Sequence, residues 1–260
     1  MIKKKAMVKS VAEKVDYGNW VLPRFIYLPA VTGLLFLGLS YVFLPLIVFA
    51  GFSFLISGYF AYARYCFSPG GGNLQAQIRQ QILSRLDWNG KGKAIDIGCG
   101  NAPLVIKLAQ RYPEAQITGI DYWGKMWGYS KSVCERNARI EGVAERVIFQ
   151  NASGSALPFK DGSFDVVVSN LALHEVRDTK DKKGVIREAL RVVKRGGRFV
   201  FQDLFLLRRT YGKTDDLLAA VRGMGVAEVN FVRTGDEAFI PLLLKIKSMV
   251  GALGILYGEK

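Results

Sequence analysis

A carboxylate and two glycines follow a short apolar stretch in the segment KAIDIGCGNAP, residues 93–103. The apolar residues predict a buried strand, and Asp96, Gly98 and Gly100 stand where that strand ends. Glycine has no Cβ, so it permits a sharp turn and lets a ligand approach the backbone closely. A second acid, Asp121, follows the next apolar stretch about 25 residues later. A carboxylate there can accept two hydrogen bonds from a ribose diol, as in dinucleotide-binding folds.

The residues around these acids indicate the kind of ligand. Tyr122 and Trp123 follow Asp121 directly and are placed to lie against a purine face. A nicotinamide-binding Rossmann domain is the weaker match, because its G-x-G-x-x-G motif requires a third glycine and a pyrophosphate over the helix N-terminus. Pro103 stands in place of that glycine. Asp96 would also put negative charge near a pyrophosphate, so the pattern suits a cationic ligand better.

Short apolar stretches alternate with amphipathic ones from about residue 73 onward. We expect strands within residues 93–100, 116–123, 146–152, 164–173, 197–205 and about 227–232, and helices within 74–86, 102–112, 129–143 and 183–193. This alternation predicts βαβ units and a parallel sheet covered on both faces. Ligands bind beyond the carboxyl ends of the strands in such sheets, which is where both acids stand.

Five segments carry a family resemblance. They are DIGCG (96–100), GID (119–121), NASGSALPF (151–159), DGSFDVVVSNLALHEV (161–176) and LRVVKRGGRFVFQD (190–203). In order and spacing they resemble class I S-adenosylmethionine-dependent methyltransferases, nearest the ubiquinone/menaquinone-type small-molecule branch. The resemblance spans about residues 73–260. It implies an α/β, Rossmann-like fold with a seven-stranded, mostly parallel sheet and one antiparallel strand, for which residues 252–258 are the candidate.

The resemblance also implies S-adenosyl-L-methionine as the cofactor and a role for each site residue. The glycine loop would hold the methionine part, with Asp96 near its ammonium group, and Asp121 would bind both ribose hydroxyls. Asn151 and Ala152 occupy the adenine-reading position, where many members have an aspartate; an asparagine accepts a hydrogen bond there without charge, which bears on affinity. The expected cofactor residues are Asp96, Gly98, Cys99, Gly100, Asn101, Asp121, Tyr122, Trp123, Asn151, Ala152, Asn170 and Leu171.

Methyl transfer from a sulfonium depends mainly on in-line positioning of the acceptor. A base is needed only if the acceptor must lose a proton. His174 is the only histidine and follows the fourth strand, beside the expected methyl group. It is the candidate general base, with a structural or cavity-lining role as the alternative. We expect no metal site, because Cys66, Cys99 and Cys134 show no C-x-x-C spacing.

The segment between Arg24 and Arg64 contains no charged residue and no histidine. As one helix it would be about 58 Å long, nearly twice the hydrocarbon core of about 30 Å. Pro45 lies near its middle and would end or bend a helix. We therefore expect a two-helix transmembrane hairpin over residues 25–64, with almost no loop. Shallow insertion into one leaflet and a soluble apolar core are the alternatives, whereas a signal peptide would be shorter and nearer the N-terminus.

Basic residues precede this hairpin and predict its orientation. The N-terminal segment, residues 1–24, contains Lys3, Lys4, Lys5, Lys9, Lys14 and Arg24 against Glu13 and Asp16. The positive-inside rule places this segment in the cytoplasm. Two spans would return residues 65–260 to the same side, so we expect an integral membrane protein with a cytoplasmic catalytic domain. Anionic headgroups attract such lysines, which accounts for part of the net charge of +14.

The apolar segment at residues 239–250 is too short to span a bilayer. It is either an interfacial anchor, with Lys245 and Lys247 toward phosphates, or a helix packed over the sheet edge. The sequence thus predicts a membrane-anchored methyltransferase with a small, amphiphilic or lipid-like acceptor. The alternatives are a tethered methyltransferase of protein or nucleic acid and a non-catalytic cofactor-binding module. We expect no nucleic acid partner, since no Lys/Arg block with interleaved aromatic residues is present.

Overall fold

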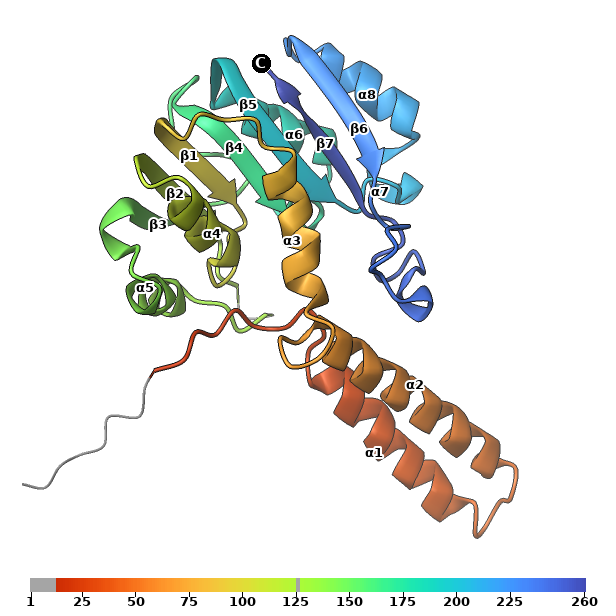
Figure 1. Cartoon of the computed structure of the whole chain (residues 1–260). Coiled ribbons are helices and arrows are strands. Elements are labelled where there is room, and N and C mark those ends of the chain that lie inside the picture. Colours follow the sequence, from red (N-terminus) through yellow and green to blue (C-terminus); the bar gives the residue numbers. More distant parts are fainter. Residues whose placement is uncertain (1–12, 125–126) are drawn as a thin grey trace, which may run out of the picture.

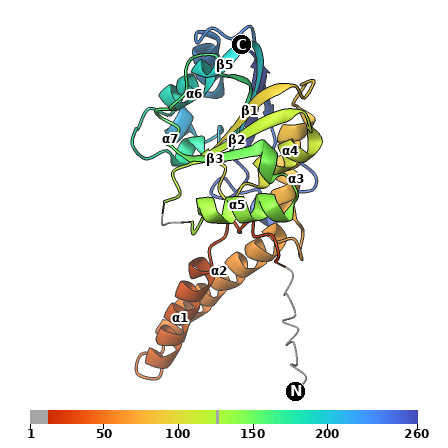
Figure 2. The same ribbon diagram turned by 90° about the vertical axis from the view of Figure 1, so that its left-hand side faces the viewer.

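The computed structural model describes residues 13–124 and 127–260. A pair of antiparallel helices projects from one end of an α/β domain (Figure 1), and a view turned by 90° shows the same pair extending beyond helix α5 (Figure 2). The basic residues Lys3, Lys4, Lys5 and Lys9, on which the predicted orientation rests, lie outside the described residues.

Seven strands of the described chain form one mixed sheet. They are β1 (Gly92–Ile97), β2 (Ala115–Asp121), β3 (Val147–Asn151), β4 (Phe164–Asn170), β5 (Val193–Asp203), β6 (Glu228–Arg233) and β7 (Gly254–Glu259). Their order is β3-β2-β1-β4-β5-β7-β6, with the first five parallel and β7 antiparallel to both of its neighbours. This confirms the predicted sheet. The central strands are continuously apolar because they are buried on both faces.

Helices cover both faces of the sheet and create two apolar cores. One core contains side chains of α3 (Leu74–Ser84), α4 (Pro103–Arg111) and α5 (Lys131–Ile140). The other contains side chains of α6 (Lys182–Arg191), α7 (Arg208–Tyr211) and α8 (Thr214–Arg222). Helices α7 and α8 were not predicted. Short 3₁₀ turns, η1 (Ala144–Arg146), η2 (Leu173–Glu175) and η3 (Leu242–Leu244), complete the described elements.

The charge-free segment forms helices α1 (Arg24–Leu39) and α2 (Leu46–Phe67). They pack closely: a Cβ added to Gly33 would lie 2.8 Å from Cε1 of Phe54, and Ser57 Oγ donates to the Ile26 carbonyl across 2.9 Å. Pro45 is the N-cap of α2, so the chain breaks near it as predicted. The expectation of almost no loop is wrong, because residues 40–45 form a turn. Helix α1 ends at Leu39, before the residue that precedes Pro45.

Only α2, of the described helices, is long and apolar enough to cross a membrane. Helix α1 has 16 residues, and at 1.5 Å per residue it is about 24 Å long. The predicted pair of spans therefore stays a prediction. Outward-facing side chains of both helices are exposed, among them Leu28 and Val48. The hairpin is consequently not packed inside the α/β domain.

Residues 239–250 do not form the helix that was one of the two alternatives for this segment. Only the 3₁₀ turn η3 forms there, and the rest folds back on itself through hydrogen bonds such as Val250 N–H to the Leu244 carbonyl, 3.3 Å. Ile240, Leu244 and Val250 are buried in a cluster with Phe67 at the base of the hairpin. Tertiary packing of these apolar side chains therefore overrides the local helical pattern.

Candidate active site

The carboxyl ends of β1, β2 and β4 border one cavity of about 1160 Å³. Most predicted site residues line it: Gly98, Cys99, Gly100, Asn101, Asp121, Tyr122, Trp123, Ala152, Asn170, Leu171 and His174. These residues come from four loops, and the sheet topology brings them together because parallel strands present their carboxyl ends at one edge. Asp96 and Asn151 are not among the lining residues.

The loop after β1 follows the edge of the cavity and is fixed to β2. Gly98 N–H and Cys99 N–H both donate to the Ile120 carbonyl, at 2.8 and 2.9 Å. Gly98 has a φ of +78°, and a Cβ added there would lie 2.0 Å from Cβ of Ala172. Gly100 has a φ of +56°. Glycine is required at position 98 both by the backbone conformation and by the approach of Ala172.

Asp121 connects the loops after β1 and β2. Its Oδ2 accepts from Gly100 N–H at 2.9 Å and its Oδ1 accepts from Trp123 N–H at 2.7 Å. Burial raises the pKa of this carboxyl, while the backbone hydrogen bonds act in the opposite direction. Each carboxylate oxygen has a second lone pair. Asp121 can therefore still accept two further hydrogen bonds from a ligand in the cavity.

Asp96 lies beneath the glycine loop and is almost fully buried. Its Oδ1 has no hydrogen-bond partner among the described residues, and the same is true of Oδ1 of Asn170, which lines the cavity. Burial and the neighbouring charge of Asp121 raise the pKa of Asp96 to about 8, although the charge of Arg79 opposes this. Two unpaired acceptors at one edge of the sheet fit a cationic donor such as an ammonium group.

Three of the loops at this edge each contain one non-glycine residue in the left-handed region. These are Ala102 (φ +68°) after β1, Trp123 (φ +46°) after β2 and Leu171 (φ +54°) after β4. Such residues cost free energy and cluster at functional sites. The sequence shows nothing of this strain, because none of the three residue types favours that conformation.

Asn151 differs from its predicted place. Its side-chain Nδ2 donates to the Tyr122 carbonyl at 2.8 Å, and the residue is exposed outside the cavity. Its neighbour Ala152 does line the cavity. The Nδ2 of Asn151 thus holds the loop after β2, and the adenine-reading role of this residue stays a prediction.

His174 is paired with a buried carboxylate. Its Nδ1 hydrogen-bonds to Oδ1 of Asp203 and its backbone N–H donates to Oδ2 of the same residue at 3.1 Å. Its Nε2 lies 3.5 Å from Oε1 of Glu175. Burial alone would lower the pKa of His174, but the charges and hydrogen bonds of Asp203 and Glu175 raise it to about 10. The imidazole is therefore protonated at neutral pH and serves as a donor.

Several lining residues were not predicted. Arg79 of α3 lines the cavity, and its guanidinium carbon lies 5.8 Å from the ring centroid of Trp20. Burial lowers the pKa of Arg79 to about 10, so it still carries positive charge at neutral pH. Tyr17 also lines the cavity, and its hydroxyl donates to Oε1 of Glu141 at 2.9 Å. The sequence feature that could have identified Arg79 is its positive charge within the predicted amphipathic helix 74–86.

The segment before the hairpin is fastened to the domain beside this cavity. Asn137 Oδ1 accepts from Asp16 N–H at 3.0 Å, and Asn137 Nδ2 donates to the carbonyls of Asp16 and Asn101, at 2.9 and 3.0 Å. The chain then passes α5 and reaches α3 before it enters α1 (Figure 1). One buried amide side chain thereby connects the glycine loop to the N-terminal segment.

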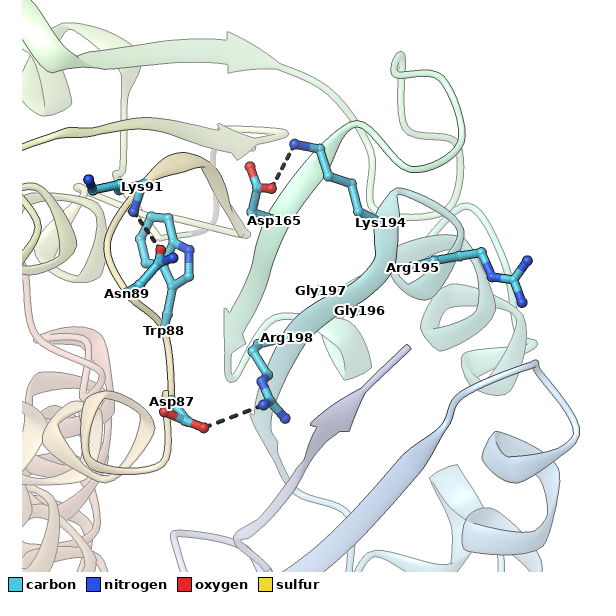
Figure 3. Close-up of a pocket in the computed structure, with 10 residues that line it drawn as sticks. All are labelled: Asp87, Trp88, Asn89, Lys91, Asp165, Lys194, Arg195, Gly196, Gly197 and Arg198. Atoms are coloured by element: carbon cyan, nitrogen blue, oxygen red, sulfur yellow. Dashed lines mark hydrogen bonds and ion pairs between the residues drawn. The ribbon is translucent and has the colours of Figure 1, made fainter.

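A smaller cavity of about 370 Å³ contains none of the predicted site residues. Figure 3 shows that its charged side chains are mostly paired: Lys194 Nζ lies 2.7 Å from Asp165 Oδ1, and Arg198 Nη2 lies 3.4 Å from Asp87 Oδ2. Arg195 points away from the other side chains in the same view. Nor do the described residues contain a group of three acids, cysteines or histidines able to hold a metal ion.

Comparison with known proteins finds similarity to methyltransferases. Residues 95–201 match the family model described as Methyltransferase domain. The 27-O-demethylrifamycin SV methyltransferase of Amycolatopsis mediterranei is 32% identical over 142 residues, covering 54% of this chain and 48% of that protein. The demethylmenaquinone methyltransferase of Geobacillus kaustophilus is 32% identical over 124 residues, covering 47% and 49%. The chain thus spans about half the length of the curated relatives it matches.

Solved structures share the fold. A geranyl diphosphate C-methyltransferase from Streptomyces coelicolor, in complex with geranyl diphosphate and S-adenosyl-L-homocysteine, superposes with a TM-score of 0.55 at 13% identity, covering 72% of this chain and 80% of that one. The [4+2]-cyclase SpnF gives a TM-score of 0.52 at 18% identity, covering 70% and 79%. The fold is therefore the Rossmann-like methyltransferase fold, and residues 95–201 within it are those that match the Methyltransferase domain model. The cyclase illustrates that this fold does not fix the reaction.

Proposed function

We propose that the chain is an S-adenosyl-L-methionine-dependent methyltransferase that methylates a small, amphiphilic or lipid-like molecule at a membrane. The observation that carries this proposal is the cavity lined by the glycine loop, Asp121 and Asn170, with the unpaired Oδ1 of Asp96 buried in the strand that leads into that loop. When bound, the cofactor supplies an activated methyl group on a sulfonium.

The chain's own residues would bind the cofactor through complementary charges. Asp121 offers two acceptors to the ribose hydroxyls, and Asp96 with Asn170 offers acceptors to the ammonium group. Arg79 supplies positive charge for the carboxylate. A cation entering this edge restores partners to two oxygens that are otherwise buried and unsatisfied, which favours binding.

The acceptor would be positioned by His174, which Asp203 holds at the cavity wall. With its proton in place, the imidazolium would position the acceptor by its charge and through Nε2–H, which it shares with Glu175 at 3.5 Å. Positioning for in-line attack is the main contribution that this reaction needs. The earlier interpretation of His174 as a general base requires the neutral imidazole, which the Asp203 and Glu175 carboxylates disfavour.

Membrane anchoring by the hairpin supports a lipid-like acceptor. An enzyme and an acceptor that share the bilayer meet at a raised effective concentration. The length and exposure of α2 support a span, and the basic N-terminal segment supports a cytoplasmic domain. Sodium carbonate extraction of native membranes tests this: an anchored chain stays in the pellet, and a chain released to the supernatant contradicts anchoring.

Methyl transfer is tested by incubating the detergent-solubilised chain with S-adenosyl-L-methionine labelled in the methyl group and extracted membrane lipids. We expect label in the organic phase with wild type and almost none with Asp121→Ala. Label that appears only in protein or nucleic acid fractions would support the tethered macromolecule methyltransferase. Cofactor binding without transfer to any fraction would support a non-catalytic module.

A further inference from the structure

The hairpin forms part of the wall of the active-site cavity. The cavity that the glycine loop and Asp121 border is also lined by Phe25 of α1 and by Tyr59 and Phe60 of α2. Its volume of about 1160 Å³ exceeds the range of roughly 300 to 1,000 Å³ typical of a pocket for one small ligand. The space beyond the proposed cofactor end is therefore large enough for a second molecule, and the hairpin encloses it.

The hairpin end of the cavity is aromatic and reaches the hairpin surface. The rings of Phe25 and Phe60 stack with centroids 5.4 Å apart, and Tyr59 meets Phe60 edge-on at 5.5 Å. Phe25 lines the cavity and yet is 38% exposed. An aromatic wall thus continues from the interior of the cavity to the side of α1.

The folded-back segment 239–250 forms the opposite side of this opening. Met249 and Val250 line the cavity, and Tyr59 Oη donates to the Leu243 carbonyl at 3.1 Å, which fixes the segment to α2. Its outer side chains are apolar and exposed, with Leu242 at 82% and Leu243 at 60%. Exposed apolar surface therefore continues from the hairpin onto this segment, as expected for one face in contact with lipid.

Further inside, the lining changes from apolar to polar. Leu171 and Leu204 line the cavity and pack in the same apolar cluster as the base of the hairpin. His174 lines it as well and supplies positive charge, and Arg209 lines it with an exposed cationic side chain. The cavity thus offers an apolar path at the hairpin and polar groups near the glycine loop, which is the polarity of an amphiphile with its head inward.

We infer that the acceptor is a long-chain amphiphile that enters sideways from the bilayer, through a doorway formed by Phe25, Tyr59, Phe60 and Met249. This inference rests on the proposed function and assigns the hairpin a second role, as part of the acceptor site. The apolar chain lies along the stacked rings of Phe25 and Phe60 while the head reaches His174. Binding of the chain is driven by burial of apolar surface against these rings.

The test uses the full chain in phosphatidylcholine nanodiscs that contain a phosphatidylcholine with a diazirine on one acyl chain. After irradiation, labelled peptides are identified by mass spectrometry. We expect adducts on the peptides that contain Leu171 and Leu204, since the doorway connects these residues to the hairpin side of the cavity. Labelling confined to the outer faces of α1 and α2 would overturn the inference.

A matched pair of variants separates the doorway from the hairpin as a whole. Phe60→Gln changes the doorway, whereas Phe49→Gln makes the same change in α2 at a ring that pairs with Phe36, away from the cavity. We expect Phe60→Gln to reduce labelling at Leu171 and Leu204 about tenfold, since it removes a buried aromatic contact, and Phe49→Gln to leave it unchanged. Equal labelling in both variants would overturn the inference.

Cofactor affinity, measured on the same samples by titration calorimetry, keeps the two proposals apart. We expect both variants to bind S-adenosyl-L-methionine as wild type does, which also shows that the domain is folded. Intact cofactor binding without interior labelling in wild type would refute the doorway and leave the methyltransferase proposal standing. Absence of cofactor binding in wild type would refute the proposed function itself.

Discussion

Asp203 holds His174 at two points, accepting a hydrogen bond from its Nδ1 and another from its backbone N–H. Asp203 ends β5 and is completely buried, while His174 lies in the turn η2 after β4. The pair therefore joins two strand ends at the cavity and determines both the orientation and the charge of the imidazole.

The charge of His174 predicts the pH dependence of the reaction. Because carboxylates raise its pKa to about 10, the protonated form persists below that pH and is lost as the pH rises through it. We expect kcat to be level from pH 7 to 9 and to fall above about 10. His174→Ala should lower kcat roughly 100-fold, and His174→Gln, which keeps an N–H donor, should lower it less. A rate that instead rises tenfold per pH unit toward pH 10 would identify the neutral imidazole as a general base.

We expect substitution of Asp121 to weaken cofactor binding strongly and substitution of Asn151 to change it little. Hydrogen bonds to a charged group contribute about 1.5–3 kcal/mol, so Asp121→Ala should weaken binding of S-adenosyl-L-methionine about 10- to 100-fold. Asn151→Ala should change it less than about threefold, because this side chain binds the Tyr122 carbonyl outside the cavity. Titration calorimetry measures both. A large loss with Asn151→Ala would instead support the adenine-reading role expected from the sequence.

Replacing Asp96 should give a variant that is more stable than wild type but binds the cofactor less tightly. Its pKa is raised from an ordinary 3.8 to about 8, so the native state disfavours the ionised form and stability decreases as the pH rises between these values. Asparagine cannot ionise, so Asp96→Asn removes the cost of a buried, unpaired charge, which is at least about 1–3 kcal/mol. Asp96→Asn should therefore be more stable than wild type by this amount above pH 8 and equally stable near pH 4, while its cofactor affinity falls about tenfold.

Asp165→Asn is the control for this prediction. The pKa of Asp165 is lowered: burial raises it, but Lys194 and the Lys93 N–H outweigh that effect. Its contribution to stability is present above the ordinary pKa and is lost as the pH falls. Thermal unfolding at pH 4 and pH 8 compares the two variants with wild type. At pH 8 we expect Asp96→Asn to be more stable than wild type and Asp165→Asn to be less stable. A destabilised Asp96→Asn at pH 8 would show that the carboxylate has a favourable partner in the cofactor-free state.

Gly98 predicts a large loss of stability on substitution. In Gly98→Ala the left-handed backbone costs about 1–2 kcal/mol, and overlap with Ala172, whose Cβ would be 2.0 Å away, adds about 1–3 kcal/mol. Gly142→Ala carries a similar φ of +71° in open space and should lose only the first contribution. Thermal unfolding compares them, and the second change Ala172→Gly should recover part of the loss. Equal effects at both positions would refute the close approach to Ala172.

The sequence predicted the sheet and its ligand-binding edge because strands buried on both faces are continuously apolar and because Asp96 and Asp121 follow two of them directly. It could not predict the pairing of His174 with Asp203, since a contact between residues 29 positions apart depends on β4 and β5 being neighbours. The hydrogen bond from the Asn151 side chain to the Tyr122 carbonyl likewise depends on β2 and β3 being neighbours in the fold. The segment 239–250 has a helix-like pattern, yet packing against the hairpin base determines its conformation.

The most direct test of the central claim is transfer of a labelled methyl group from S-adenosyl-L-methionine to extracted native membrane lipids, measured for wild type and Asp121→Ala at equal protein concentration. The account predicts lipid-soluble labelled product with wild type and a loss of at least about tenfold in the variant, in line with the value of the ribose hydrogen bonds. Folded wild-type chain that neither binds the cofactor nor labels any lipid would contradict it.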